Sequence, residues 1–259
     1  MRTITNEYMR ERLSKGIRNS KRGAMSYRGI TLTQGTLPNA EGSAEAIIGN
    51  TKVLAGIKID VAEPMPDTPE EGNLTTSAEL LPMASQDYDI GPPTPEGVEY
   101  ARVVDRGIRH GSIIDMGKLF IEEGKVWSVF LDLYVLNYDG NLFDAGTLAA
   151  MAALATTKMP RYEDGKVIRD DKMKNLETGN TVTSCTFAKV LDSLIIDPDG
   201  AEEELMKARL TIANDANTVR AMQKGLGGSF SIKEADALID AAFDKSKDLR
   251  NIVKKSIGD

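Results

Sequence analysis

The first half of the chain carries three apolar runs of strand length in close succession, and these runs constrain the fold more than any other feature. They cover residues 30–34, 44–48 and 53–59, and the pair Gly49-Asn50 separates the last two. Asn and Gly both tolerate a positive φ angle, so this pair is typical of the turn in a β-hairpin. The pattern therefore predicts antiparallel strands near the start of the chain.

Helices are expected on either side of further strands. Residues 94–96 read Thr-Pro-Glu, which provides a capping hydroxyl, a proline at the first helical position and an acid in the first turn. This predicts a helix that runs to about residue 110. An alanine-rich helix is expected over residues 142–156, and an amphipathic helix is expected over residues 3–18.

Most of the remaining sequence reads as strands and loops. Residues 62–97 are rich in Pro, Gly and acids around one apolar run at 74–81, which predicts a long surface loop pinned by a strand. A capping box over residues 231–234 (Ser-Ile-Lys-Glu) predicts a final helix. Further strands are expected at residues 118–121, 126–136, 181–189, 191–196, 208–213 and 218–223.

These elements define a fold class and a provisional domain organisation. Mixed strands with helices on one side predict an α+β fold, or α/β in a loose sense. A chain of 259 residues can bury a full core, either as one large domain or as two intimate halves. We expect a single domain over residues 1–259, with an N-terminal half at approximately 25–160 and a C-terminal half at 161–259.

The composition argues against several kinds of site. His110 is the only histidine, which argues against a Ser–His–Asp triad and a multi-histidine metal site. Cys185 is the only cysteine, which leaves no intramolecular disulfide and no thiolate metal site. There is no G-x-x-x-x-G-K-[ST] loop, and residues 225–228 (Gly-Leu-Gly-Gly) are expected to form a tight turn. We expect neither a metal ion nor a cofactor, and we expect Cys185 to be a buried, inert thiol.

Apolar runs are too short for a membrane span, since none approaches the ~20 residues that cross a bilayer. We therefore expect a cytoplasmic protein without membrane contact. Acidic residues are concentrated after the strand expected at 191–196, and such a run is typical of a solvated helix start. A magnesium site there has no further support in the sequence. The acids are Asp197, Asp199, Glu202, Glu203 and Glu204.

The most informative polar pattern is a set of three arginines on the first long helix. Arg102, Arg106 and Arg109 are spaced by four and three positions, which places them on one helix face. Guanidinium groups suit phosphate oxygens, so one interpretation is a clamp on the RNA backbone. The alternative is internal pairing with Glu99 or Asp105. The net charge of −7 means that any RNA contact must come from such a local cluster.

Several segments, in order along nearly the whole chain, resemble the RNase PH family. Residues 41–56 (EGSAEAIIGNTKVLAG) look like its opening strand hairpin, and residues 101–109 (ARVVDRGIR) resemble its arginine-bearing helix. Residues 139–145 (DGNLFDA) fall where the family enters its phosphate-binding helix, and residues 194–199 (LIIDPD) and 227–230 (GGSF) match further on. The resemblance implies an RNase PH-like fold of two β-α halves, with mixed sheets packed against helices.

Within that family the sequence is most similar to the non-catalytic subunits of the archaeal RNA exosome. Residues 66–72 (PDTPEEG) and 87–93 (DYDIGPP) carry this likeness, whereas residues 20–22 read Ser-Lys-Arg where relatives usually have Asp-Gly-Arg. The resemblance implies a hetero-hexameric ring with a catalytic homologue, RNA-binding cap subunits and single-stranded RNA as partners. It also implies that Arg102, Arg106 and Arg109 face the last nucleotides of the RNA. Bracing of the ring interface is the alternative role.

Two departures from the catalytic members imply that this chain has no catalytic residues. Catalytic members place Gly-Ser/Thr-Arg after an Asp-Gly at a helix N-terminus, which binds phosphate. Residues 141–143 here read Asn-Leu-Phe, and neither an isobutyl nor a phenyl group can donate to phosphate. The acid expected before the strand that follows Asp197 is also missing, because residues 205–208 read Leu-Met-Lys-Ala.

The resemblance thus implies a non-catalytic, RNA-contacting subunit of a phosphate-dependent 3′→5′ exoribonuclease. Two alternatives remain open. The chain could be an active phosphorolytic RNase that uses other donors for phosphate, or a purely architectural ring member without RNA contact.

Overall fold

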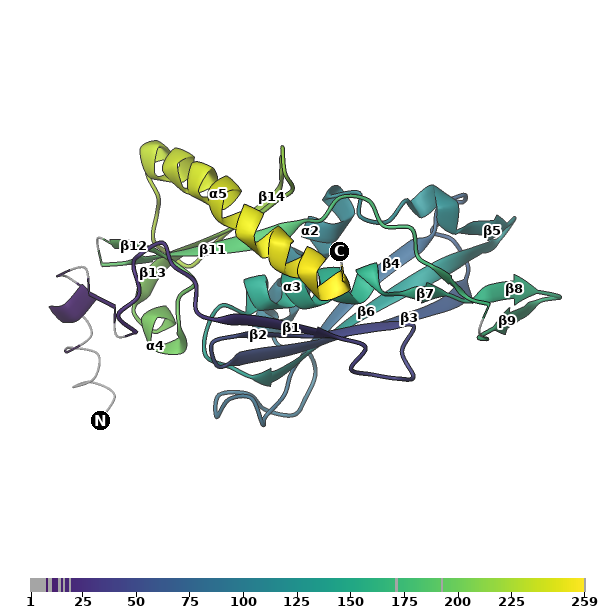
Figure 1. Ribbon diagram of the computed structural model, residues 1–259, viewed down its shortest axis with the longest axis horizontal. Helices are drawn as coiled ribbons and strands as arrows, with labels where there is room; N and C mark the ends of the chain where they lie inside the picture. Colours follow the sequence, from purple (N-terminus) through teal and green to yellow (C-terminus); the bar gives the residue numbers. More distant parts are fainter. Residues whose placement is uncertain are drawn as a thin grey trace.

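Within the residues that the structure describes, six strands form one mixed sheet (Figure 1). A computed structural model describes residues 8, 11–13, 15, 17–18, 20–170, 172–191 and 193–258. The strands are β1 (Ile30–Gln34), β2 (Gly42–Ile48), β3 (Thr51–Ala62), β4 (Asn73–Leu80), β5 (Phe120–Glu122) and β6 (Lys125–Asn137). Their order is β1-β2-β3-β6-β4, with β5 paired to β6. β4 runs parallel to β6, whereas the other neighbours are antiparallel.

A second, antiparallel sheet comes from the later part of the chain. It contains β11 (Thr183–Val190), β12 (Ser193–Ile196), β13 (Met206–Asn214) and β14 (Val219–Gly225), in the order β12-β11-β13-β14. Four short strands lie between β6 and β11 in the sequence, namely β7 (Lys158–Met159), β8 (Arg161–Glu163), β9 (Lys166–Ile168) and β10 (Lys174–Asn175). Two of them, β8 and β9, form a hairpin at the end of the molecule opposite β12 (Figure 1).

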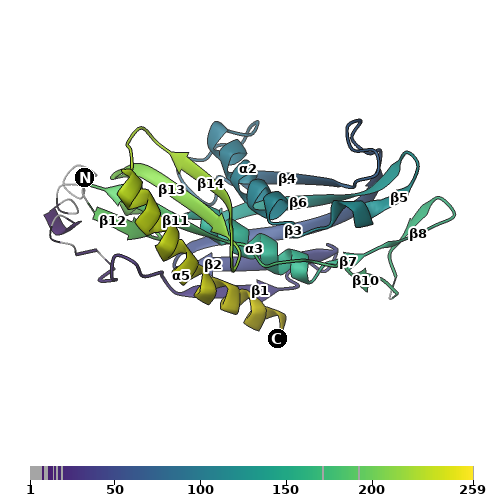
Figure 2. The same cartoon turned by 90° about the horizontal axis from the view of Figure 1, so that it is seen from above.

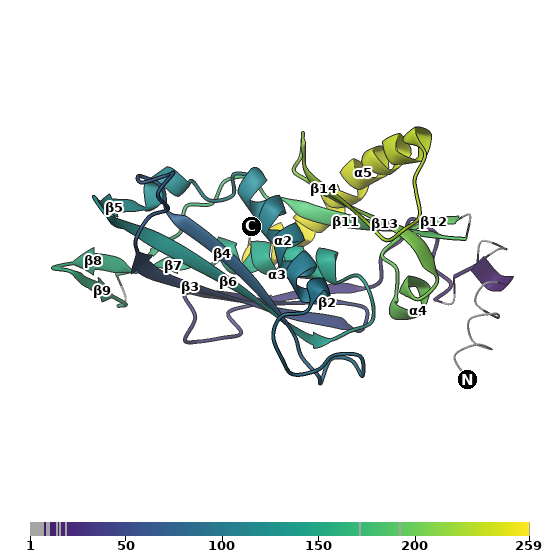
Figure 3. The ribbon, with the colours of Figure 1, turned by 180° about the vertical axis from the view of Figure 1, so that it is seen from behind.

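The helices lie between and beside the sheets. α2 (Pro95–His110) packs on β4 and also on β14, and Figure 3 shows it beside both sheets. α3 (Leu142–Ala155) contacts β2, β3 and β11, and α5 (Ile232–Ile257) crosses β11 and β1 (Figure 2). A one-turn helix, α4 (Gly200–Glu203), follows β12, and a 3-10 helix, η1 (Met116–Leu119), precedes β5.

The core has α3 at its centre. All residues of this helix from Leu142 to Leu154 are buried, which is typical of a helix that is covered on every side. The side chains of β3 alternate in burial, because successive residues of a strand face opposite sides of the sheet, and Val53, Ala55, Ile57 and Ile59 lie on the buried side. The N-terminus of α3 is buried as well, and the helix contacts strands of both sheets.

The main elements follow the predictions. The helix over 95–110, the turn at Gly49-Asn50 and the α+β, RNase PH-like architecture are confirmed. Cys185 is buried on β11, as predicted. The strand expected at 118–121 is wrong in its first half, which is 3-10 helix because the side chain of Asp115 caps a turn there.

Some elements were not predicted, and one predicted helix lies mostly outside the described residues. The sequence patterns did not indicate β7–β10, which are shorter than the windows in which periodicity can be read. The acidic run did indicate a helix start, and α4 begins within it. Most of the helix predicted over 3–18 lies outside the described residues, of which 8 and 11–13 are helical. The division into halves stays a prediction. No helix in the described ranges is long and apolar enough to cross a membrane.

Candidate functional site

The N-terminus of α3, which the family resemblance assigns to phosphate, is occupied by side chains of the protein itself. Asn141 precedes the helix in the left-handed region, at φ 59°, and its backbone N–H donates to Oε1 of Glu203 at 2.9 Å. Its side-chain amide donates to Asp144 at 2.9 Å and to Asp197 at 2.8 Å. A carboxylate of the chain thus takes the position at which a helix N-terminus attracts an anion.

Phe143 is a core residue, and together with Asn141 and Leu142 it forms the α3 corner. The ring is 6% exposed, the guanidinium carbon of Arg209 lies 4.2 Å from its centroid, and Tyr100 meets it edge-on at 5.8 Å. Leu142 is also buried. The first turn of α3 therefore presents apolar surface where a phosphate-binding member of the family has a hydroxyl and a guanidinium.

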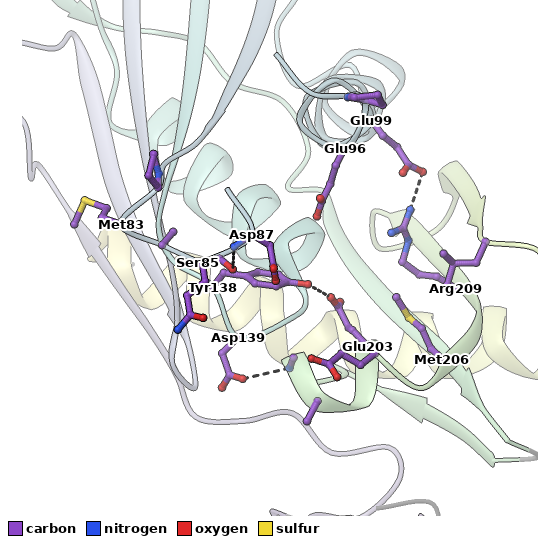
Figure 4. A pocket seen from close by; sticks show the side chains of 18 residues that line it. Met83, Ser85, Asp87, Glu96, Glu99, Tyr138, Asp139, Glu203, Met206 and Arg209 are labelled. Carbon is purple, nitrogen blue, oxygen red and sulfur yellow. Dashed lines mark hydrogen bonds and ion pairs between the residues drawn. The ribbon is translucent and has the colours of Figure 1, made fainter. Parts of the chain in front are cut away.

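Glu203 and Arg209, which contact this corner, also line a cavity of about 1020 Å³ with acidic walls (Figure 4). Tyr138 donates its hydroxyl to Glu203, and burial raises the pKa of Glu203. Burial also raises the pKa of Glu96, to which the Tyr88 hydroxyl lies 3.5 Å away. Arg209 is the one basic residue among the described lining residues. The acidic residues of the lining are Asp87, Glu96, Glu99, Asp139, Glu203 and Glu204.

Asp197, which accepts from the side chain of Asn141, also binds two arginines. It is fully buried at φ 51°, and it accepts from Arg22 at 2.7 Å and from Arg28 through both the backbone and the side chain. Burial disfavours its charge, yet the hydrogen bonds and positive charge of Arg28 hold its pKa below the usual value. The interpretation of this acidic run as a solvated helix start is wrong for Asp197.

The same correction applies to Glu202. Arg18 and Glu202 form a buried pair, 1% and 0% exposed, with both guanidinium–carboxylate contacts within 2.8 Å. Asp199 caps α4, and only Glu204 faces solvent as the run predicted. Nearby buried arginines explain the difference, because they make burial of the carboxylates tolerable. No group of His, Cys, Asp or Glu suited to a metal ion is found among the described residues.

Residues 20–22, which depart from the Asp-Gly-Arg usual in relatives, lie at the end of a turn that positions Arg22. Lys21 adopts φ 57°, in the region that favours the glycine usual in relatives, and Arg22 reaches Asp197. The segment therefore anchors the start of the chain to the second sheet despite the substitution.

The three predicted arginines differ in their exposure and in their partners. Arg102 is exposed, and no hydrogen bond or ion pair is found for it in the described part of the chain. Arg106 is half-buried and donates to Gln223 on β14 at 2.5 Å. Arg109 pairs with Asp105 at 3.0 Å and also donates to a backbone carbonyl on β4.

The outcome for the alternative of internal pairing is mixed. The expected pair of Arg109 with Asp105 is present. Glu99 instead binds Arg209 at 2.7 Å. Sequence reasoning missed Arg209 and Gln223, and no local signal marks them, since each meets α2 only through the folding of β13 and β14 against it. RNA contact by the arginines stays a prediction.

Family models match both halves of this architecture. The model for the 3′ exoribonuclease family, domain 1, matches residues 26–160, and that for domain 2 matches residues 180–245. The chain belongs to this RNase PH family. Its RNase PH domains therefore place the α3 corner and the α2 arginines within a known exoribonuclease architecture.

Individual relatives of this chain include exosome complex components named Rrp42. The chain is 45% identical to the exosome complex component Rrp42 of Thermococcus gammatolerans, over 95% of this chain and 92% of that protein. It is 40% identical to the Rrp42 component of Methanothermobacter thermautotrophicus, over 98% and 96%. Among solved structures, it matches a chain of the Archaeoglobus fulgidus exosome with RNA bound to the active site, with TM-score 0.91 and 38% identity over 96% of this chain and 98% of that one.

Proposed function

We propose that this chain is a non-catalytic subunit of an archaeal exosome ring in the cytoplasm. It pairs with a catalytic homologue in a hetero-hexamer that also carries RNA-binding cap subunits. In that ring it contributes RNA binding, through Arg102, Arg106 and Arg109, and helps to shape the 3′→5′ phosphorolytic site of its partner. The near full-length similarity to Rrp42 components, and to a chain of an exosome with bound RNA, supports this assignment.

The observation that carries the non-catalytic part is the filled N-terminus of α3. Phosphorolysis requires an inorganic phosphate held beside the RNA phosphodiester, and therefore cationic and N–H donors. Here the backbone N–H of Asn141 is bound to Glu203, and Phe143 lies under Arg209.

The energetic balance at this corner disfavours phosphate. A charged carboxylate at about 4 Å would repel a phosphate charge by roughly 4 kcal/mol near a protein surface. A helix N-terminus stabilises an anion by up to about 2 kcal/mol in a partly buried geometry. The repulsion is the larger effect. Burial raises the pKa of Glu96 and of Glu203 and so reduces their share of it, but Asp87, Glu99, Asp139 and Glu204 also line the cavity.

The experiment that tests this function is reconstitution. The chain is purified alone and after co-expression with a catalytic RNase PH homologue, and each sample is given single-stranded RNA and phosphate. We expect a ring of six RNase PH subunits by mass determination, phosphate-dependent release of nucleoside diphosphates from the ring, and no release by this chain alone. Release by this chain alone would favour the alternative of an active phosphorolytic enzyme.

The ion pair of Arg109 with Asp105 supports a second candidate function. Arg109 is neutralised by Asp105, which favours a purely architectural ring member for at least that residue. Replacement of the arginines in the assembled ring distinguishes the two functions, because an architectural subunit would leave RNA affinity unchanged.

A further inference from the structure

The side-chain amide of Gln223 links two residues of the arginine helix to the second sheet. Gln223, half-buried on β14, accepts from Nη2 of Arg106 at 2.5 Å and donates from Nε2 to Oε1 of Glu99 at 3.1 Å. A guanidinium group can only donate and an ionised carboxylate can only accept. The amide therefore satisfies both neighbours in one orientation, with its oxygen toward Arg106.

The carboxylate of Glu99 extends this link to α3. The same Oε1 atom also accepts from Nη2 of Arg209 at 2.7 Å (Figure 4). Arg209 lies over the ring of Phe143 at 4.2 Å. A continuous line of contacts thus runs from Phe143 through Arg209 and Glu99 of the cavity wall, and then through Gln223, to Arg106.

The chemistry of the partner distinguishes Arg106 from the other arginines of α2. Arg109 is held by a carboxylate, which cancels its charge, and Arg102 has no partner in the described part of the chain. Arg106 is held by a neutral acceptor, so its side chain is fixed while its positive charge stays available to an anion. Fixing a long side chain in advance reduces the rotamer freedom that is lost on binding.

We propose that Gln223 is a positioning residue for RNA, which holds the guanidinium of Arg106 ready for a backbone phosphate without neutralising it. This inference rests on the proposed function, since Arg106 must contact RNA for Gln223 to matter. In this arrangement Arg209, which packs on Phe143, supports the position of Arg106 through Glu99 and Gln223.

The test is a double-mutant cycle on RNA affinity in the assembled ring. Gln223→Met keeps the length of the side chain and removes both hydrogen bonds, and we expect it to weaken RNA binding about fivefold. In an Arg106→Ala background the same change is expected to have no further effect. Gln34→Met on β1 is the matched control, because it also removes a half-buried amide, bonded to Ser256 at 3.1 Å, far from α2.

A second variant separates positioning from simple packing. Gln223→Glu retains an acceptor for Arg106 but neutralises it and faces Glu99 with a like charge. We expect a loss of RNA affinity of about tenfold, larger than that of Gln223→Met, with a weaker dependence on salt because one cation is withdrawn from the RNA.

The outcomes separate failure of this inference from failure of the proposed function. If Gln223→Met leaves affinity unchanged while Arg106→Ala weakens it, the positioning role is wrong and the RNA role of Arg106 stands. If Gln223→Met weakens binding equally in both backgrounds, its effect does not pass through Arg106 and the inference is overturned. If Arg106→Ala itself changes nothing, the proposed RNA contact of Arg106 fails and the inference fails with it.

Discussion

Replacing Arg18 by Met is expected to lower the free energy of unfolding by about 3–5 kcal/mol, because it leaves a carboxylate buried without its cation. Arg18 is 1% exposed and donates to both oxygens of Glu202, and it also donates to the carbonyls of Ile196 and Asp197. Urea unfolding of the purified chain measures the effect.

Two further variants identify the cause of that loss. The double variant Arg18→Met, Glu202→Met removes the charge as well as its partner, and we expect it to recover much of the stability. Lys118→Met is the control, since it breaks an ion pair with Glu177 in which both side chains are exposed, and it is expected to leave the unfolding midpoint almost unchanged. A loss of stability in Arg18→Met no greater than in the control would contradict the stabilising role of this buried ion pair.

Removing the charges of Arg102 and Arg106 together is expected to weaken RNA binding by the assembled ring about 10- to 100-fold at low salt. The logarithm of the affinity should also depend less steeply on the logarithm of the salt concentration. For single-stranded RNA, two lost phosphate contacts reduce that slope by about 1.4. Fluorescence anisotropy with a labelled RNA, titrated over a range of salt concentrations, measures both quantities.

The matched control removes two cations at a distance from α2. Arg161→Ala with Lys166→Ala changes the net charge equally, and both residues lie on the β8–β9 hairpin at the far end of the molecule (Figure 1). We expect this control to retain nearly full affinity. If the α2 variant behaves like the control, the arginines are architectural and the proposed RNA contact is refuted.

Features that depend on neighbouring residues could be predicted from the sequence. The Thr-Pro-Glu start of α2, the capping box of α5 and the turn at Gly49-Asn50 are decided by groups a few positions apart, and they appear where expected. The loss of phosphate donors at 142 and 143 is likewise a local fact of side-chain chemistry.

The way in which the site is filled could not be predicted in the same manner. Glu203 reaches Asn141 from 62 positions away, and Arg18 reaches Glu202 across 184 positions. In the sequence these acids form one charged run. Nothing in that run distinguishes Asp197 and Glu202, which bind arginines, from Glu204, which is exposed. Only the packing of α4 against α3 and against the segment before β1 makes that distinction.

The central claim is that the α3 corner of this chain holds no phosphate, and a crystal structure of the assembled ring grown with orthophosphate tests it most directly. The partner's site supplies the positive control in the same crystal. The account predicts phosphate density in the catalytic subunit and none within hydrogen-bonding distance of residues 141–143 of this chain. Density for the ion beside Phe143, with Glu203 displaced from the N–H of Asn141, would contradict it.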